Sequence, residues 1–232
     1  MAIVKFENVS KSYTGLETAV KSVTFEVQAG EFAALAGPSG SGKTTILNLA
    51  AGLDDANSGS ISLCDKSLEG LTRLEMARLR RESVGFVFQA YNLFPVLTAL
   101  ENVMYPLALN HVPPRERRSR AEAALKEVGL DGLENRFPNQ MSGGQQQRVA
   151  IARAIATNPK IVFADEPTAN VDSTTADKLL ELFQRLNKER GITFLFSSHD
   201  PMVLERAGRI IRVKDGQILN PEKVERHLKL VA

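Results

Sequence analysis

The sequence predicts an α/β fold with a mostly parallel sheet, an N-terminal antiparallel β-layer and an inserted helical subdomain. Short apolar runs separated by helical patterns indicate buried parallel strands, at residues 32–36, 160–164 and 193–196. Residues 3–9 and 23–27 alternate apolar and polar side chains, which is typical of half-buried antiparallel strands. From residue 92 to 141 the pattern is helical, with no strand. We therefore expect one domain over residues 1–232, with a helical subdomain at about 92–156.

Composition sets limits on the class of protein. A chain of 232 residues with 43% hydrophobic content is long enough for one large core. The net charge of +2, from 29 basic and 27 acidic residues, gives no electrostatic argument for nucleic acid binding. The basic cluster at 115–120 lies in a helical pattern and is expected to be a solvated face. Cys64 is the one cysteine, which excludes an internal disulfide and fits a reducing compartment.

No segment has the pattern of a leader or a membrane span. The N-terminus carries charge too early for a signal peptide. The uncharged stretch from Ser83 to Leu100 is interrupted by Gln89, Asn92 and Pro95, so it cannot cross a bilayer. We therefore expect a cytoplasmic protein.

The first half of the chain supplies the antiparallel layer and the start of the parallel sheet. Residues 60–63 alternate like the first strands and are expected to join them. Residues 71–81 are polar and helical. Residues 84–88 then have the pattern of a buried strand that ends at Gln89.

Local capping signals predict the helices of the subdomain. Thr98 and Glu101 have the spacing of a capping box, so a helix begins there, and Pro106 should kink or end it. Pro114 suits the first position of the next helix, and Gly129 its end. Ser142-Gly-Gly-Gln145 repeats the capping-box spacing and precedes a helix over residues 146–156.

The last part of the chain completes the parallel sheet. Residues 174–190 form an amphipathic helix with one apolar face, made of Ala176, Leu179, Leu180, Phe183 and Leu186. Residues 209–219 predict a hairpin with Asp215-Gly216 in its turn. The final dozen residues have the pattern of a short polar helix.

Residues 36–45, AGPSGSGKTT, carry a phosphate-binding motif. They fit G-x-x-x-x-G-K-[S/T] between an apolar strand and a helix, which is the context that this motif requires. Glycines let successive N–H groups converge, and the helix N-terminus adds partial positive charge. Lys43 can reach the β- and γ-phosphates, and the Thr44 hydroxyl suits Mg²⁺. A Gly/Ser-rich connection that binds nothing does not account for Lys43-Thr44. The expected contacts of a nucleoside triphosphate are Gly37, Pro38, Ser39, Gly40, Ser41, Gly42, Lys43, Thr44 and Thr45.

Further polar side chains follow the ends of apolar strands. Because ligands collect beyond the carboxyl ends of parallel strands, Gln89 and His199 are candidates for the same site. Asp165 suits a Mg²⁺-associated carboxylate across from Thr44, although an Asp there is commonly a helix cap. Glu166 follows it and is a candidate general base that polarises the attacking water. His199 could instead be a satisfied buried histidine.

The motif Ser142-Gly-Gly-Gln145, followed by QQRVAIARA, resembles the signature of the ATP-binding-cassette (ABC) ATPases. The resemblance covers about residues 1–220 and implies an ABC-type phosphate-loop core. Tyr13 matches the aromatic that stacks on adenine, and Gln89 matches the glutamine that touches Mg²⁺ and the transmembrane partner. The remaining matches are Asp165 and Glu166, the Walker B pair, and His199, the switch histidine. Two positions depart conservatively: the D-loop is Ala169-Asn-Val-Asp172, and Met141 stands where Leu is usual.

The resemblance implies how the site works. Two subunits pack head to tail, so that Ser142, Gly143, Gly144 and Gln145 cap the γ-phosphate held by the opposite subunit. A capped helix alone explains Ser142 and Gln145 but not the two glycines between them. The implied metal ligands are Thr44, Gln89 and Asp165; the implied catalytic residues are Glu166, His199, Lys43 and Gln89; Asp172 is implied as a further ATP contact. ATP and Mg²⁺ are the implied cofactors, and a homodimer is the implied assembly.

Residues 84–103 and 164–168 are similar to those of bacterial lipoprotein-releasing and macrolide-exporting subunits. This implies an ATP-hydrolysing subunit of an ABC transporter complex, peripheral at the inner face of the cell membrane, which powers export, lipoprotein release or mechanotransmission. The alternative is an ATP-gated switch that controls a periplasmic enzyme through a membrane partner. A DNA-repair or translation ATPase of this family would need a coiled-coil insert or two cassettes.

The segment 89–97 is the expected contact with a transmembrane permease subunit. It places several large apolar residues in a predicted connecting loop, and such a patch is rarely left wet without a use. The alternative is that Leu93, Phe94 and Leu97 fold inward beneath the helical subdomain.

Overall fold

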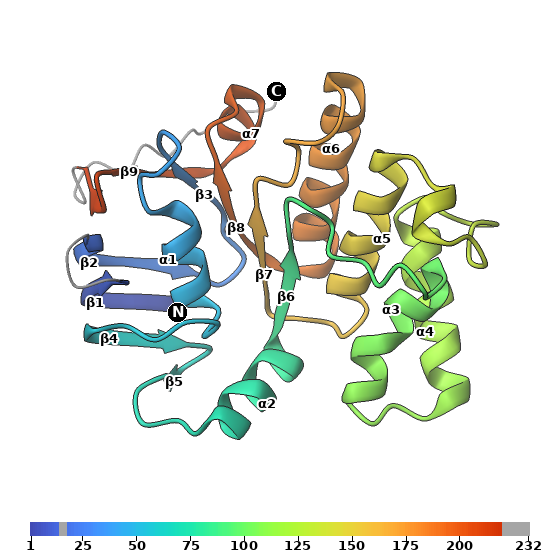
Figure 1. Ribbon diagram of the computed structural model, residues 1–232, viewed down its shortest axis with the longest axis horizontal. Helices are drawn as coiled ribbons and strands as arrows, with labels where there is room; N and C mark the ends of the chain where they lie inside the picture. The colour runs from blue at the N-terminus through green and yellow to red at the C-terminus, as the bar shows by residue number, and fades with distance from the viewer. Residues whose placement is uncertain (14–17, 220–232) are drawn as a thin grey trace.

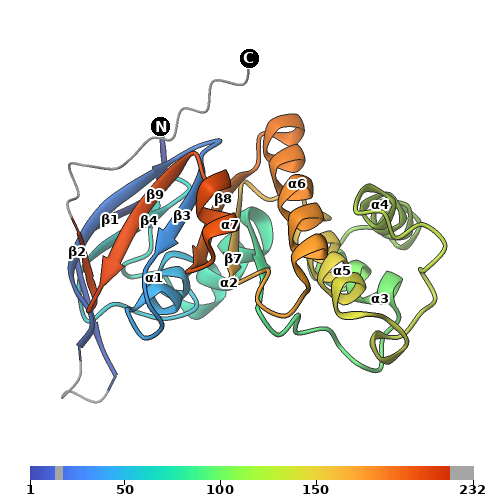
Figure 2. The same cartoon turned by 90° about the horizontal axis from the view of Figure 1, so that it is seen from above.

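The computed structural model describes residues 1–13 and 18–219. Helix α1 (Lys43–Ala50) lies between an antiparallel sheet and a larger, mostly parallel sheet (Figure 1). Figure 2 shows helices α3 (Ala99–Leu109) and α4 (Pro114–Glu127) at the end of the molecule far from β1 and β2. The C-terminal helix that the sequence suggests lies outside the described residues.

The antiparallel sheet has the order β2-β1-β4-β5. Its strands are β1 (Ala2–Ser12), β2 (Thr18–Gln28), β4 (Ser58–Leu63) and β5 (Lys66–Ser67). The predicted β-layer is therefore present, but β1 and β2 run further than the alternating pattern indicates. Register shifts after Phe6 and Val9 break the alternation, and pairing continues to Ser12 opposite Thr18. The two-residue β5 carries no alternating pattern and was not predicted.

The parallel sheet has the order β10-β9-β3-β8-β7-β6, and β10 alone runs antiparallel to its neighbour. Its strands are β3 (Phe32–Ala36), β6 (Val84–Val87), β7 (Ile161–Asp165), β8 (Thr193–Ser198), β9 (Arg209–Lys214) and β10 (Gln217–Ile218). The β9–β10 hairpin turns at Asp215 and Gly216, whose φ angles are 51° and 78°. Positive φ at both turn residues is what the Asp-Gly pair predicts.

The parallel sheet is buried on both faces, which explains its apolar strands. Alternate residues of β3 join two different cores: Ala33 and Leu35 pack with α1 and the antiparallel sheet, whereas Ala34 and Ala36 pack on the helical side. Helix α6 (Ser173–Arg190) covers that side with the predicted apolar face, all of which is buried. Helix α2 (Arg73–Ser83) precedes β6, and the short α7 (Pro201–Arg206) was not predicted.

The stretch between β6 and β7 contains helices and no strand among its described residues. After α3 and α4 come a short 3₁₀ turn (Pro138–Gln140) and α5 (Gly143–Ile155). The Thr98 and Glu101 capping box forms, and so does the end of α4 before Gly129, which has φ 74°. Pro106 does not end α3. The helix continues to Leu109, because Leu107 directly after the proline is fully buried in the core shared with α4 and α5.

The buried apolar side chains of the described residues form these two cores. No helix within residues 1–13 and 18–219 is both long and apolar enough to cross a membrane. The basic cluster at the start of α4 is a solvated face, where Arg118 pairs with Glu122 and Arg120 with Glu116.

Candidate nucleotide-binding site

The loop after β3 leads into α1, and no side chain caps the backbone N–H groups of the first turn of this helix. Gly42 is the N-cap of α1, at φ 102°, and no side chain caps the helix. A Cβ at Gly42 would lie 2.5 Å from the carbonyl oxygen of Ala19 in β2, so only glycine fits this turn. The first N–H groups of a helix have no partner inside it. The N-terminus of α1 is therefore open to an anion.

A cavity of about 320 Å³ lies over these donors. Its walls come from β2, the loop before α1, the first turn of α1, and the segments after β6, β7 and β8. The lining residues are Ala19, Ser39, Gly40, Gly42, Lys43, Thr44, Thr45, Gln89, Glu166 and His199. The structure thus brings most of the predicted phosphate contacts together with Gln89, Glu166 and His199.

Lys43 lies at the floor of this cavity and is 6% exposed. Its Nζ donates hydrogen bonds to the carbonyl oxygens of Gly37 (2.8 Å) and Pro38 (2.9 Å). The same Nζ is 3.9 Å from Oε1 of Glu166. Its positive charge is therefore held inside the loop, where a phosphate can compete for its donors.

Thr44 and Asp165 meet as the sequence predicts. The Thr44 hydroxyl donates to Oδ1 of Asp165 over 3.1 Å, and the Ser197 hydroxyl donates to the same oxygen. Asp165 ends β7 and pairs in register with Ser197 of β8, so the sheet itself fixes the carboxylate. Asp165 is not the cap of a helix.

Glu166 turns away from Asp165 toward His199. It has φ 43°, a left-handed conformation that favours glycine and is strained for a side-chain-bearing residue. Oε1 of Glu166 is 2.8 Å from Nδ1 of His199, and Oε2 accepts a hydrogen bond from Ser198 over 3.2 Å. A neutral His199 must carry its proton on Nδ1 to donate here. His199 is 65% exposed by its side chain, so it is not a buried structural histidine.

Tyr13 lies beside this cavity rather than in its lining. Ser12 pairs with Thr18, which precedes the cavity residue Ala19, so Tyr13 is at the same end of the β1–β2 hairpin. The Tyr13 side chain is exposed, and its hydroxyl donates to Asp54.

The predicted signature segment forms the N-terminus of α5, away from the lining of the cavity. Ser142 Oγ accepts from the Gln145 N–H, and Gln145 Oε1 accepts from the Ser142 N–H, as the capping-box spacing predicts. Among the described residues of this one chain, residues 142–145 are not part of the cavity lining.

The two glycines of this segment also lie close against side chains of their own chain. A Cβ at Gly143 would lie 2.8 Å from the Tyr91 hydroxyl, and a Cβ at Gly144 would lie 2.6 Å from Cγ2 of Thr175. A larger residue at either position would therefore require the Tyr91 or the Thr175 side chain to shift. Close packing is thus a second reason for small residues here, beside access to the N–H groups of the helix end.

Asp172 caps a helix in this structure. Its carboxylate accepts from the N–H and the hydroxyl of Thr175 in the first turn of α6, and these bonds hold its pKa below the usual value. It is not among the residues that line the cavity.

Comparison with known proteins identifies the family. Residues 20–169 match the family model described as ABC transporter. This chain belongs to the ABC transporter family. The match spans the phosphate loop, the signature segment and the Asp165–Glu166 pair. The chain is therefore an ABC-type ATPase domain.

Relatives and a solved structure agree with this. The chain is 44% identical over 229 residues to an uncharacterized ABC transporter ATP-binding protein, MJ0796, of Methanocaldococcus jannaschii, covering 96% of this chain and 97% of that protein. It is 44% identical over 227 residues to the macrolide export ATP-binding/permease protein MacB of Syntrophobacter fumaroxidans, but it spans only 32% of that longer protein. The dimeric post-hydrolysis structure of the MJ0796 cassette bound to ADP and Pi matches with a TM-score of 0.88 at 44% identity, covering 96% of this chain and 98% of that one.

Sequence reasoning missed three residues that shape the site of this ABC ATPase. Ser197 and Ser198 hold the two carboxylates of Asp165 and Glu166, and Ala19 supplies part of the cavity wall. The serines could have been found, because they directly follow the apolar strand expected at residues 193–196 and precede His199. Ala19 carries no chemical signal and depends on how β2 packs.

Proposed function

We propose that ATP binds with its phosphates over the N-terminus of α1, and that two copies of this chain close around two ATP molecules. The observation that carries the proposal is the convergence of the open helix end, Lys43 and Glu166 on one cavity. The backbone N–H groups of the helix end supply fixed donors. The Lys43 ammonium, which now donates to the carbonyl oxygens of Gly37 and Pro38, donates instead to the β- and γ-phosphates when ATP binds. Tyr13, at the adjacent hairpin end, is proposed to stack on adenine.

Mg²⁺ fits the oxygen donors beside this helix end. The Thr44 hydroxyl and the Asp165 carboxylate are in contact, and the exposed Gln89 borders the same cavity. Hydroxyl, carboxylate and amide oxygens are ligands that Mg²⁺ accepts, together with phosphate oxygens and water. When bound, Mg²⁺ neutralises charge on the β- and γ-phosphates.

Glu166 and His199 act on the water and the γ-phosphate. His199 donates from Nδ1 to Oε1 of Glu166, and Ser198 holds Oε2, so the carboxylate is oriented before a nucleotide arrives. Glu166 orients the attacking water and accepts its proton as a general base. The exposed edge of the His199 ring can then meet the γ-phosphate.

The signature helix completes the site across a dimer. The capping box uses the N–H of Gln145, which leaves the N–H groups of Gly143 and Gly144 at the N-terminus of α5. These are the groups that a γ-phosphate of a second subunit would meet. The related MJ0796 cassette is dimeric in its ADP-bound structure, which supports this arrangement.

The membrane partner is proposed to dock in an apolar groove near the segment 89–97. A hollow of about 260 Å³ there has walls made mostly of aromatic and apolar side chains. Its lining residues are Arg81, Val84, Gly85, Phe86, Phe88, Asn92, Phe94, Tyr105, Pro106, Arg153, Ala154 and Thr157. Phe94 is 41% exposed and its ring is 4.8 Å from that of Tyr105, whereas Leu93 packs inward. The exposure of Phe94 supports a partner surface, whereas the packing of Leu93 supports the alternative of inward folding.

Buried Asn102 fixes the shape of this docking segment. Its side chain accepts from the Phe94 N–H and donates to the carbonyl oxygens of Phe94, Leu97 and Thr98. We propose that a short helix of a transmembrane permease occupies the groove, so that closure of the dimer moves that helix. The chain would then work at the inner face of a cell membrane as the motor of an exporter, as in the MacB relative named for macrolide export.

The chemistry is tested by Glu166→Gln. Loss of a positioned general base typically costs about 10²–10⁴-fold in rate. ATP affinity should persist, because Lys43, Thr44 and Asp165 remain. Steady-state phosphate release and nucleotide titration measure the two properties separately. Glu181→Gln on exposed α6 surface is the matched control, and near-normal turnover in Glu166→Gln would remove the proposed role.

The partner surface is tested by Phe94→Glu, with Val96→Glu as control. Val96 is 77% exposed on the same segment but does not line the groove. Phe94→Glu should leave the basal ATPase rate of the isolated subunit unchanged and abolish recruitment to membranes that contain the permease. Val96→Glu should leave both intact. Equal recruitment of the two variants would place the docking surface elsewhere.

A further inference from the structure

A buried lysine ties the end of β1 to the loop that follows α1. Lys11 is 9% exposed, and its Nζ lies 2.6 Å from Oδ1 of Asp54 and 2.7 Å from the carbonyl oxygen of Asp55. Burial acts to raise the pKa of the Asp54 carboxyl. Hydrogen bonds from Lys11, Tyr13 and the Asp55 amide outweigh burial and hold that pKa below its usual value. Asp54 is therefore an anion at neutral pH, paired with the Lys11 cation.

The same two residues hold the Tyr13 side chain. The Tyr13 hydroxyl donates to Oδ2 of Asp54 over 2.9 Å, and Nζ of Lys11 lies over the ring at 5.0 Å from its centroid. A cation over one face of an aromatic ring is an attractive contact and covers that face. Tyr13 is still 59% exposed, so the rest of the ring remains open.

This cluster borders the nucleotide cavity through the β1–β2 hairpin. Lys11 pairs with Val20, and the neighbouring Ala19 both lines the cavity and packs against Gly42 of the phosphate loop. Asp54, which holds the Tyr13 hydroxyl, follows the C-terminal end of α1. The N-terminal end of the same helix carries the N–H groups proposed to bind phosphate.

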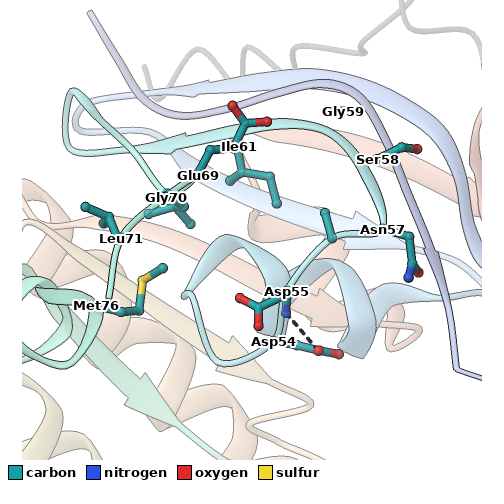
Figure 3. Close-up of a pocket in the computed structure, with 12 residues that line it drawn as sticks. Asp54, Asp55, Asn57, Ser58, Gly59, Ile61, Glu69, Gly70, Leu71 and Met76 are labelled. Carbon is teal, nitrogen blue, oxygen red and sulfur yellow. Dashed lines mark hydrogen bonds between the residues drawn. The ribbon is translucent and has the colours of Figure 1, made fainter. Parts of the chain in front are cut away.

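Asp55 provides a comparison within the same loop. Figure 3 shows Asp54 and Asp55 side by side at the edge of a hollow of about 430 Å³, joined by the bond from the Asp55 N–H to Oδ1 of Asp54. The Asp55 side chain is exposed and makes no ion pair or hydrogen bond among the described residues. This hollow is lined by Asp54, Asp55 and Glu69 and by no lysine or arginine, so it does not suit a triphosphate.

We propose that Lys11 and Asp54 are positioning residues, which hold Tyr13 so that its open face stacks on the base of ATP. The inference rests on the proposed nucleotide site. Lys11 covers one face, Asp54 fixes the hydroxyl edge, and the ring is pre-ordered before the nucleotide binds. Affinity gained in this way depends on the base and not on the phosphates.

The test compares ATP with inorganic tripolyphosphate, which lacks the base and the sugar, by calorimetric titration. Asp54→Asn keeps the shape of the side chain but removes the charge that pairs with Lys11. It should weaken ATP binding about two- to tenfold, the range of one hydrogen bond, and leave tripolyphosphate affinity unchanged. Asp55→Asn, the neighbouring carboxylate, should change neither. In a Tyr13→Ala background, Asp54→Asn should have no further effect on ATP binding.

Other results overturn the inference. Equal weakening of ATP and tripolyphosphate by Asp54→Asn would mean that the pair merely supports the phosphate-loop helix. Unchanged ATP affinity in Asp54→Asn, when Tyr13→Ala weakens it, would mean that Tyr13 needs no positioning. If Tyr13→Ala itself leaves ATP affinity intact, the proposed adenine contact fails first, and the positioning role fails with it. Lys11→Met should repeat the Asp54→Asn result wherever it folds, as judged by circular dichroism.

Discussion

Two helix N-termini in this chain carry glycine-rich segments, and they are built differently. At α1 the N-cap is Gly42 in a left-handed conformation, and no side chain satisfies the first turn. At α5 the N-cap is Ser142, which forms a complete capping box with Gln145. At Gly42 a Cβ would meet the backbone of β2 in a left-handed conformation, whereas at Gly143 and Gly144 it would meet only the side chains of Tyr91 and Thr175.

The difference indicates separate roles for the two ends. The α1 end lies in a cavity with Lys43, Thr44 and Glu166 from its own chain, so it can bind a phosphate by itself. The α5 end is capped by its own side chains, and residues 142–145 do not line that cavity. We infer that α1 binds the nucleotide and that α5 recognises a nucleotide already bound by another subunit.

The largest effect should follow a change at the α1 end. Gly42→Ala forces a side chain into a left-handed conformation, which costs about 1–2 kcal/mol, and also drives a Cβ against the Ala19 carbonyl. We expect ATP affinity to fall at least about tenfold by titration. Gly30→Ala is the matched control, because Gly30 has φ 79° but no atom within 4 Å of a Cβ and no place in the site. A similar loss of affinity in both variants would mean that general strain, and not the phosphate loop, is responsible.

A smaller effect should follow loss of the cap at α5. Ser142→Ala should cost about 0.5–2 kcal/mol of stability, since an N-cap hydroxyl is lost. For a chain of this size the melting temperature then falls by about 2–4 °C per kcal/mol. Thr72→Ala removes the equivalent hydroxyl from the capping box of α2 and should cost a similar amount. ATP affinity of the monomer should be unchanged in both variants, and a large loss of affinity in Ser142→Ala alone would erase the distinction between the two helix ends.

These two regions also show what the sequence could and could not reveal. The α1 end and the capping box of α5 are local patterns, and both form as predicted. The packing role of Gly143 and Gly144 depends on side chains 52 and 31 positions away, at Tyr91 and Thr175, so no local pattern contains it.

Contacts between residues distant in the sequence also explain two further differences in the fold, in α3 and in the first two strands. Pro106 predicts a kink or an end, and α3 does not end there but continues to Leu109, with the following Leu107 buried among α4 and α5. Bulges extend β1 and β2 past the end of their alternating pattern. Helix α7 differs in that it has a local signal, because Asp200 and Pro201 are typical of an N-cap and a first helical position. The contact of Glu166 with His199 follows from strand ends in one sheet, whereas the serines that orient the carboxylates required the register of β7 with β8.

The central claim, that α5 of one subunit caps ATP bound at α1 of another, is tested most directly by sedimentation of Glu166→Gln chains. With ATP, this variant should accumulate as a dimer, because hydrolysis no longer opens it. Adding Ser142→Asp preserves a good N-cap but places a negative charge where the γ-phosphate of the partner should lie. Thr72→Asp makes the same change at the remote α2 cap.

We expect Glu166→Gln and its Thr72→Asp derivative to form ATP-dependent dimers, and the Ser142→Asp derivative to remain monomeric with unchanged ATP affinity. An ATP-dependent dimer that persists in the Ser142→Asp derivative would contradict the account, as would a dimer that forms equally without ATP.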